Sequence, residues 1–153
     1  MSEAERGISL ERADQIGVVV KNIDEVVEYY KNILGFGDFE QPEINYSTIK
    51  YYGKEVDCDW KMAFCDLGGV ELELIEPIQG PTIYHDFMEK QKEGLHHIGF
   101  IVNNYDEITS HIRETNIEIM QSGEGKTSRF AYFDTQNPGG VIYEIIERKV
   151  ERV

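Results

Sequence analysis

Gln15-Ile-Gly-Val-Val-Val-Lys-Asn-Ile-Asp-Glu25 recurs 82 residues later as His97-Ile-Gly-Phe-Ile-Val-Asn-Asn-Tyr-Asp-Glu107, with six of the eleven positions identical. A second match, at a separation of 71 residues, pairs Gly68-Gly-Val-Glu-Leu-Glu-Leu-Ile-Glu76 with Gly139-Gly-Val-Ile-Tyr-Glu-Ile-Ile-Glu147. Similarity that recurs in the same order along a chain is typical of a duplicated structural unit. We therefore interpret the chain as two tandem copies of one module.

Each copy is expected to contain one strand, one helix and three further strands. An asparagine, Asn22 or Asn104, follows the first apolar run, and a glutamate stands three residues later, a spacing typical of a helix N-terminus. Apolar residues then recur at helical spacing, and Gly35 marks the expected end of the first helix. Short apolar runs predict the remaining strands at 37–41, 60–66 and 70–76, then at 117–121, 128–134 and 140–147.

The expected fold class is α+β, with two tandem βαβββ modules that form a U-shaped, partly open mixed sheet around a metal site. We place the modules at about 13–77 and 95–147 of a single domain that covers residues 1–153. Gly80-Pro81 predicts the start of a linker helix at about 81–93. An insertion at 41–57 lengthens the first module. Its tyrosines favour a hairpin over the wall of a substrate pocket, and they are Tyr46, Tyr51 and Tyr52.

Composition argues against several classes of function. The net charge of −14, from 29 acidic and 15 basic residues, repels polyanions and disfavours nucleic-acid binding. No apolar run approaches the ~20 residues that would span a bilayer, so no membrane association is expected. The N-terminus is acidic where a signal peptide would be basic and then apolar, and Cys58 and Cys65 have the character of reduced thiols. We expect a cytoplasmic protein.

Four polar residues occupy matched positions in the two copies: Gln15 matches His97, and Glu73 matches Glu144. Strand side chains alternate between faces, and all four lie opposite the aliphatic face that should pack on a helix. A carboxylate inside an apolar strand is costly to bury unless a positive charge compensates it. Three oxygen donors and one imidazole suit one divalent ion such as Zn, Mn, Co, Ni or Fe.

The alternative to a metal site is that both glutamates face solvent and that His97 is an ordinary hydrogen-bonded histidine. The repeat favours the metal site, because it relates all four ligands by one pseudo-twofold operation. His96 is expected to face the other way from its neighbour and to be structural. His85 and His111 lie on helical stretches without ligand spacing.

Four segments of the chain resemble the vicinal oxygen chelate superfamily, which includes glyoxalase I, extradiol dioxygenases, antibiotic-resistance proteins and the methylmalonyl-CoA epimerases. They are Glu71-Leu-Glu-Leu-Ile-Glu-Pro77, Phe87-Met-Glu-Lys90, Gly94-Leu-His-His-Ile-Gly-Phe100 and Gly139-Gly-Val-Ile-Tyr-Glu144. The resemblance covers Ala13 to Glu147 and is strongest to the epimerases. It implies the same four metal ligands, a small acyl thioester or related carbonyl substrate, and a homodimer.

The resemblance also implies a reaction, the removal of a proton beside a carbonyl with the enolate stabilised by the metal ion. Glu144 would accept the proton, and Glu73 would share the catalytic role. We therefore expect a metal-dependent epimerase that acts on a CoA thioester. CoA is a polyanion, and three basic residues are candidates for binding it, namely Lys61, Lys126 and Arg129.

Two departures from the epimerases keep other functions open. The epimerases usually have histidine where this chain has Gln15, and a Gln/Glu/His/Glu set is similar to eukaryotic glyoxalase I. The epimerases also use a further carboxylate on the strand before the second ligand, which Trp60-Lys-Met-Ala-Phe-Cys65 does not supply. The first alternative is thus a glyoxalase I-like lactoylglutathione lyase or a related thiol-dependent lyase. The second is a non-catalytic small-molecule binding protein, which would need no metal ion.

Overall fold

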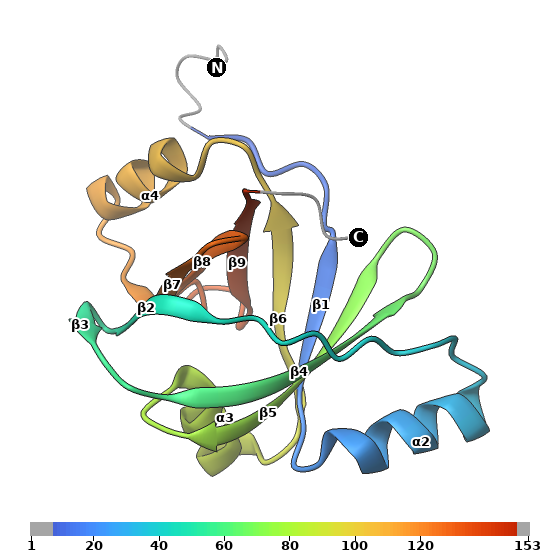
Figure 1. Ribbon diagram of the computed structural model, residues 1–153. Helices are drawn as coiled ribbons and strands as arrows, with labels where there is room; N and C mark the ends of the chain where they lie inside the picture. Colours follow the sequence, from blue (N-terminus) through green and yellow to red (C-terminus); the bar gives the residue numbers. More distant parts are fainter. Residues whose placement is uncertain (1–7, 150–153) are drawn as a thin grey trace.

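The computed structural model describes residues 8–149, which form a nine-stranded sheet and three helices (Figure 1). Both ends of the expected 1–153 domain, residues 1–7 and 150–153, lie outside the described residues. The strands are β1 (Gln15–Val19), β2 (Tyr46–Tyr51), β3 (Lys54–Glu55), β4 (Asp59–Asp66), β5 (Glu71–Gln79), β6 (Gly94–Ile101), β7 (Ile119–Gly125), β8 (Ser128–Phe133) and β9 (Ile142–Arg148). The helices are α2 (Ile23–Leu34), α3 (Ile83–Gln91) and α4 (Tyr105–Glu114).

The strand order is β3-β2-β7-β8-β9-β6-β1-β5-β4, and it displays the duplication directly. In one half β1 pairs in parallel with β5, which pairs with β4; in the other half β6 pairs in parallel with β9, which continues to β8 and β7. The first strands of the two modules, β1 and β6, meet as antiparallel neighbours at the centre. The predicted α+β fold with a curled, open mixed sheet is confirmed (Figure 1).

Local sequence signals set the helix ends. The Asn22 side chain accepts a hydrogen bond of 2.9 Å from the Glu25 backbone N–H, and Gly35 adopts the left-handed conformation (φ 70°) that ends α2. Asn104 precedes α4 but makes no such capping bond. The linker helix α3 starts later than predicted, because Thr82 rather than Pro81 caps it, through a bond from the His85 backbone N–H.

Side-chain alternation divides the apolar residues into separate cores. Val20, Leu72 and Leu74 pack beneath α2, while Ala131, Phe133 and Ile145 pack beneath α4. The opposite face of the sheet encloses a third core that includes Trp60, Phe130 and Tyr132, together with Ile83 and Tyr84 of α3. The predicted assignment of the aliphatic face to the helices is therefore confirmed, and the other face lines the inside of the curl.

The insertion folds as the predicted hairpin, with Tyr52 and Gly53 at positive φ between β2 and β3. The strand predicted at 37–41 is wrong: only an isolated bridge forms there, between Glu40 and Phe64 of β4. Pro42 has no N–H to donate to a ladder, which limits pairing on that edge. The chain instead crosses over, and β2 pairs with β7 of the second module. The segment 40–51 thus connects both edges of the curled sheet.

A β-bulge overturns the predicted orientation of His96. Gly17 of β1 faces His97, but its neighbour Val18 already faces Leu95, so β6 contains one extra residue at this point. The extra residue cancels the alternation, and both histidine rings lie on the inner side of the curl in mutual contact.

Among the helices of residues 8–149 none has the length and apolarity needed to cross a bilayer.

Candidate metal centre

The four expected ligands lie on four consecutive strands of the sheet, one on each. Gln15 is on β1, Glu73 on β5, His97 on β6 and Glu144 on β9, and each is at most 6% exposed. Gly17 is the register partner of both Glu73 and His97. In the other half Gly99 is the partner of both Glu144 and Gln15. The first module thus contributes Gln15 and Glu73, and the second contributes His97 and Glu144. All four side chains meet at the seam, the boundary between β1 and β6 where the two modules join.

Three oxygen atoms surround one nitrogen at this seam. His97 Nε2 lies 3.1 Å from Glu144 Oε1, 3.2 Å from Gln15 Oε1 and 3.3 Å from Glu73 Oε1. A single N–H can donate to one of these acceptors well, not to all three. Glu73 Oε1 and Glu144 Oε1 are buried, and among residues 8–149 neither has a hydrogen-bond donor beyond this shared His97 nitrogen. Such a set of unsatisfied acceptors is what a bound cation would complete.

The donor types fit a divalent ion. Atoms of Glu73, His97 and Glu144 all lie within 4.8 Å of one another, so these three residues could hold a metal ion. Gln15 Oε1 supplies a fourth donor, and the set of three oxygens and one imidazole suits a transition ion or zinc. Two carboxylates would balance the two positive charges.

The charges of the three groups depend on one another in the metal-free protein. Burial raises the pKa of Glu73 to about 7, although hydrogen bonding to His97 opposes this rise. Burial also lowers the pKa of His97, but the carboxylates of Glu144 and Glu73 outweigh it and raise the pKa to about 9. An imidazolium therefore neutralises part of the negative charge when the cation is absent.

Neighbouring residues orient two of the ligands. The Gln15 side-chain amide donates a hydrogen bond of 3.1 Å to Glu71 Oε1, which directs its carbonyl oxygen towards His97. His97 Nδ1 lies 2.8 Å from Nδ1 of His96, so its Nε2 is left for the oxygen ligands. The His96 ring in turn packs against the rings of Tyr84 and Tyr132. Partners of this kind fix the orientation of a metal-binding imidazole or amide.

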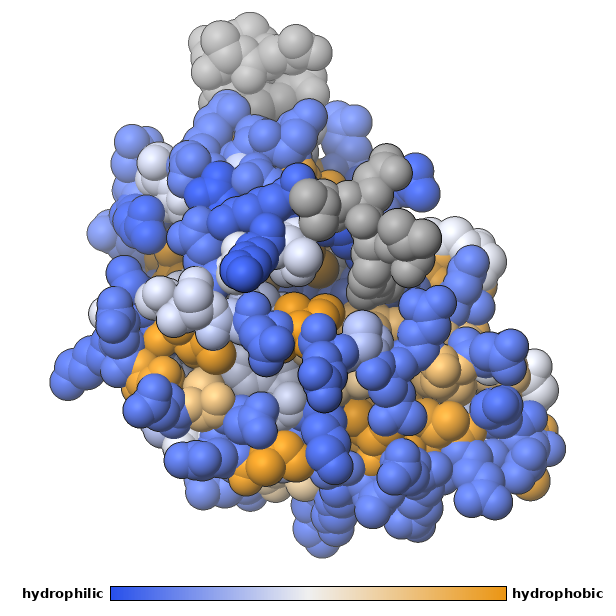
Figure 2. Space-filling model, viewed as in Figure 1, coloured by the Kyte–Doolittle hydropathy of each residue, from blue (hydrophilic) through white to orange (hydrophobic). Residues whose placement is uncertain are grey.

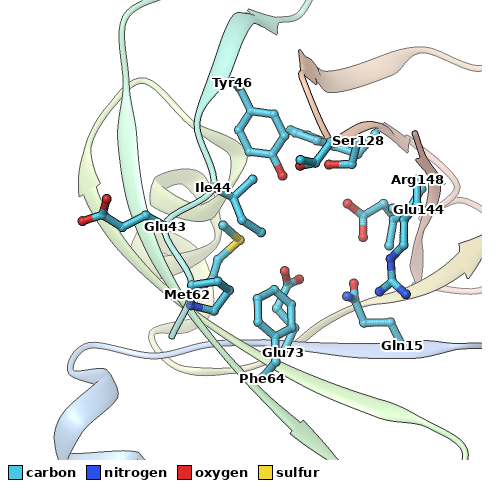
Figure 3. A pocket seen from close by; sticks show the side chains of 14 residues that line it. Gln15, Glu43, Ile44, Tyr46, Met62, Phe64, Glu73, Ser128, Glu144 and Arg148 are labelled. Carbon is cyan, nitrogen blue, oxygen red and sulfur yellow. The ribbon is translucent and has the colours of Figure 1, made fainter. Parts of the chain in front are cut away.

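A cavity of about 200 Å³ opens above the ligands (Figure 3). Its floor contains Gln15, Glu73 and Glu144, and its other lining residues are Pro42, Glu43, Ile44, Tyr46, Met62, Phe64, Thr127, Ser128, Phe130, Ile146 and Arg148. Figure 3 shows the Tyr46 hydroxyl directed into the cavity and the Glu43 carboxylate directed away from it. The outer surface contrasts with these partly apolar walls, because hydrophilic residues cover most of the face in Figure 2.

The three basic residues expected to bind CoA have different environments. Lys126 is exposed in the turn between β7 and β8, next to the cavity residue Thr127. Lys61 alternates with the inward residue Met62, so it lies on the outer face of β4. Arg129 lies on the α4 side, where it pairs with Asp106 and Glu147.

The cavity wall contains Tyr46, which the sequence assigned to a hairpin, and Arg148, which the sequence patterns did not reveal. Tyr46 lies both in the predicted hairpin and in the cavity wall, so the two alternatives considered for it do not exclude each other. Arg148 lies just beyond the repeated segment. Strand alternation from Glu144 through Ile146 would have placed Arg148 on the same face as the ligand, which is the signal that could have found it.

Comparison with known proteins identifies the family. The chain belongs to the Glyoxalase/Bleomycin resistance protein/Dioxygenase superfamily, whose family model matches residues 14–133. It is 29% identical over 145 residues to Uncharacterized protein YqjC of Bacillus subtilis, a match that covers 92% of this chain and 94% of the relative. It is 26% identical over 142 residues to the mitochondrial methylmalonyl-CoA epimerase of Bos taurus, covering 90% of this chain and 74% of that protein.

Solved structures of epimerases have the same fold. A variant of the Streptomyces coelicolor methylmalonyl-CoA epimerase in complex with 2-nitronate-propionyl-CoA has a TM-score of 0.72 at 24% identity, with coverage of 93% of this chain and 100% of that chain. A methylmalonyl-CoA epimerase in complex with methylmalonyl-CoA and NH4+ has a TM-score of 0.70 at 25% identity, with coverage of 93% and 97%. The predicted family resemblance is confirmed, and epimerases are among the relatives in both sequence and structure.

Proposed function

We propose that this protein is a metal-dependent epimerase that inverts the carbon beside the carbonyl group of a CoA thioester, in the manner of a methylmalonyl-CoA epimerase. One observation above all supports the proposal. Two buried carboxylates from matched positions of the repeat, Glu73 and Glu144, meet at the floor of one cavity beside His97. The similarity to epimerases in both sequence and structure supports the choice of reaction.

Epimerisation requires a proton to leave one face of a carbon atom and a proton to return on the other. In our proposal the Glu144 carboxylate accepts the proton from one face of the carbon. Glu73, on a different strand of the same floor, takes up a proton from water and returns it from another direction. Gln15, Glu73, His97 and Glu144 would hold a divalent ion, which as a Lewis acid would polarise the substrate carbonyl. The apolar side chains of Met62 and Phe64 leave a suitable surface for a methyl group beside the reacting carbon.

The CoA portion of the substrate would extend out of the cavity across its rim. Lys126 is the candidate phosphate contact there, because it adjoins Thr127 in the exposed β7–β8 turn. Lys61 and Arg129 remain proposals for more remote parts of CoA, since both side chains lie on the helix-covered face of the sheet.

The homodimer and the cytoplasmic location expected from the sequence remain predictions.

A second candidate function rests on Gln15. Its carbonyl oxygen lies 3.2 Å from His97 Nε2, which supports Gln15 as a fourth ligand, as the resemblance to eukaryotic glyoxalase I implies. The corresponding reaction is that of a lactoylglutathione lyase or related thiol-dependent lyase, with the same proton transfer from a hemithioacetal. A non-catalytic binding protein is the third candidate, and it would have no use for a metal ion.

Metal analysis and isotope exchange test the proposal together. We expect about one divalent ion per chain after reconstitution, and loss of the α-proton of methylmalonyl-CoA in deuterated buffer, followed by NMR. Glu144→Gln should slow this exchange by about 100-fold or more. Glu124→Gln is the matched control, because Glu124 is an exposed β7 residue paired with Lys149, away from the cavity.

Each outcome discriminates between the candidates. Exchange in wild type that Glu144→Gln leaves unchanged would remove Glu144 from the mechanism. A bound metal ion without exchange would overturn the epimerase and turn attention to the hemithioacetal of methylglyoxal and glutathione. Failure to bind any divalent ion would overturn both enzymatic candidates and favour the non-catalytic binding protein.

A further inference from the structure

The wall of the cavity that faces the ligands contains a tyrosine from the insertion. Tyr46 is the first residue of β2, in the segment that lengthens the first module. Figure 3 shows its hydroxyl group directed into the cavity, across from Glu73. The repeat therefore builds the floor of the cavity, and a part of the chain outside the repeat supplies a hydroxyl group on the facing wall.

Two aromatic residues hold the Tyr46 ring in this orientation. The ring stacks on Trp60 of β4 at a centroid distance of 5.7 Å, and it meets Phe130 of β8 edge to face at 5.0 Å. Trp60 and Phe130 are both buried in the same core, so neither ring can move aside without disturbing close-packed neighbours. Since one partner comes from each module, the tyrosine is fixed with respect to both halves of the floor.

Tyr46 is also the ionisable proton donor of the cavity outside the ligand set. Among the described lining residues five side chains are ionisable, namely Glu43, Tyr46, Glu73, Glu144 and Arg148. The Glu43 carboxylate is directed away from the cavity (Figure 3), and a guanidinium does not give up a proton in proteins. Glu73 and Glu144 would be ligands, which have to be ionised to hold a cation. A phenol keeps its proton at neutral pH, because its ordinary pKa is about 10.

We propose that Tyr46 is a catalytic acid of this site, whose hydroxyl group returns the proton to the carbon on the face that Glu144 does not reach. It acts ahead of Glu73, because Glu73 must first take up a proton from water, whereas the phenol already carries one. This inference rests on the proposed function, since it assigns one step of that reaction to a further residue.

The proton balance of the step closes with water as the only other participant. Glu144 accepts the proton of the C–H bond, and the bonding electron pair passes into the enolate. That electron pair forms the new C–H bond with the phenolic proton, which leaves Tyr46 as a phenolate. Water then reprotonates the phenolate, and Glu144 releases its proton to water. Arg148, the one lysine or arginine among the described lining residues, offsets the transient negative charge.

Deuterium exchange and inversion, measured separately by NMR from each pure epimer of methylmalonyl-CoA, test the role of Tyr46. In the metal-loaded wild type both epimers should exchange the α-proton and invert. In Tyr46→Phe inversion should fall about 100-fold or more in both directions. The epimer whose proton faces Glu144 should still exchange at close to the wild-type rate, with retention of configuration. The other epimer should exchange about 100-fold more slowly, because its proton faces the lost hydroxyl group.

Tyr51→Phe is the matched control, since it makes the same change on the same strand, where the hydroxyl group donates a hydrogen bond of 2.6 Å to Asp86. It should invert both epimers at the wild-type rate. Tyr46→Phe should keep the wild-type metal content and thermal unfolding midpoint, because its ring retains the contacts with Trp60 and Phe130.

The outcomes separate this role from the proposed function. Undiminished inversion in Tyr46→Phe, or exchange that slows equally from both epimers, would overturn the role of Tyr46 and leave the epimerase in place. Absence of exchange from either epimer in the wild type would overturn the proposed function, and the role of Tyr46 with it.

Discussion

The imidazole ring of His97 lies directly over Gly17 of the neighbouring strand, so closely that a Cβ atom on this glycine would overlap the ring. The same relation recurs in the other half of the repeat, less tightly. A Cβ on Gly99 would lie 3.1 Å from Gln15 Oε1 and 3.3 Å from Glu144 Oε1. Each repeat glycine therefore provides the space for a ligand that the other module contributes. This explains why glycine follows two residues after Gln15 and two residues after His97.

Gly17→Ala should therefore abolish metal binding. The added methyl group must displace the His97 ring, which is held against His96 and Tyr132, and such overpacking costs about 1–3 kcal/mol. Metal content after reconstitution and the thermal unfolding midpoint measure the two effects. Gly37→Ala is the control, because nothing lies within 4 Å of the position that its added Cβ would take, and it should behave as wild type. Full metal occupancy in Gly17→Ala would contradict this packing.

Glu71→Ala should weaken metal binding without removing a ligand. Glu71 accepts the hydrogen bond that orients the Gln15 amide, and loss of such an orienting partner typically lowers metal affinity about 10- to 100-fold. Competition with a chelator of known affinity measures the change. Glu71→Gln retains an oxygen acceptor at the same position and should recover most of the affinity. Equal affinity of Glu71→Ala and wild type would show that Gln15 needs no such support.

Asn22→Ala should lower the free energy of unfolding by about 1 kcal/mol, as is usual for the loss of an N-cap. The equivalent substitution Asn104→Ala should cost clearly less, because Asn104 makes no capping hydrogen bond to the backbone. Chemical denaturation of the two variants provides the comparison. Equal losses in both would mean that the cap at α2 contributes nothing beyond the intrinsic preference for asparagine.

Buried tyrosines should make the fold sensitive to alkaline pH. Burial raises the pKa of Tyr105 to about 12 despite the nearby Arg129, and raises the pKa of Tyr84 and Tyr132 well above their ordinary value of 10.0. The folded state thus favours the neutral phenol, so stability is complete below pH 10 and declines as the pH rises towards about 12 and beyond.

Absorbance at 295 nm distinguishes the two states. In the native protein fewer than the nine tyrosines should ionise near pH 10, whereas all nine should do so in denaturant. Ionisation of all nine near pH 10 in protein that remains folded by circular dichroism would contradict the burial of these phenols.

Much of the architecture could be predicted because it depends on short-range rules. The offset of 82 residues between Gln15 and His97, together with strand alternation, predicted which faces pack on the helices and which four side chains converge. The cap at Asn22 and the left-handed Gly35 are properties of a few consecutive residues, and both are confirmed. The repeat added the long-range information, since matched residues of two equivalent modules must be related by the same symmetry.

Only the tertiary structure decided at which positions the chain departs from strand alternation and from pairing within one module. The chain after Glu40 leaves β4 and pairs with β7, because the free edge of the second module accepts a ladder that Pro42 limits on the first. The bulge beside Gly17 turns His96 inwards, which a strict two-residue period forbids. Arg148 faces the ligands because β9 continues past the repeated segment. The sequence by itself determined the two modules, the ends of α2 and which four side chains converge. Strand pairing and packing between distant segments determined the cavity above these side chains, because those contacts depend on surfaces that exist only after the sheet has curled.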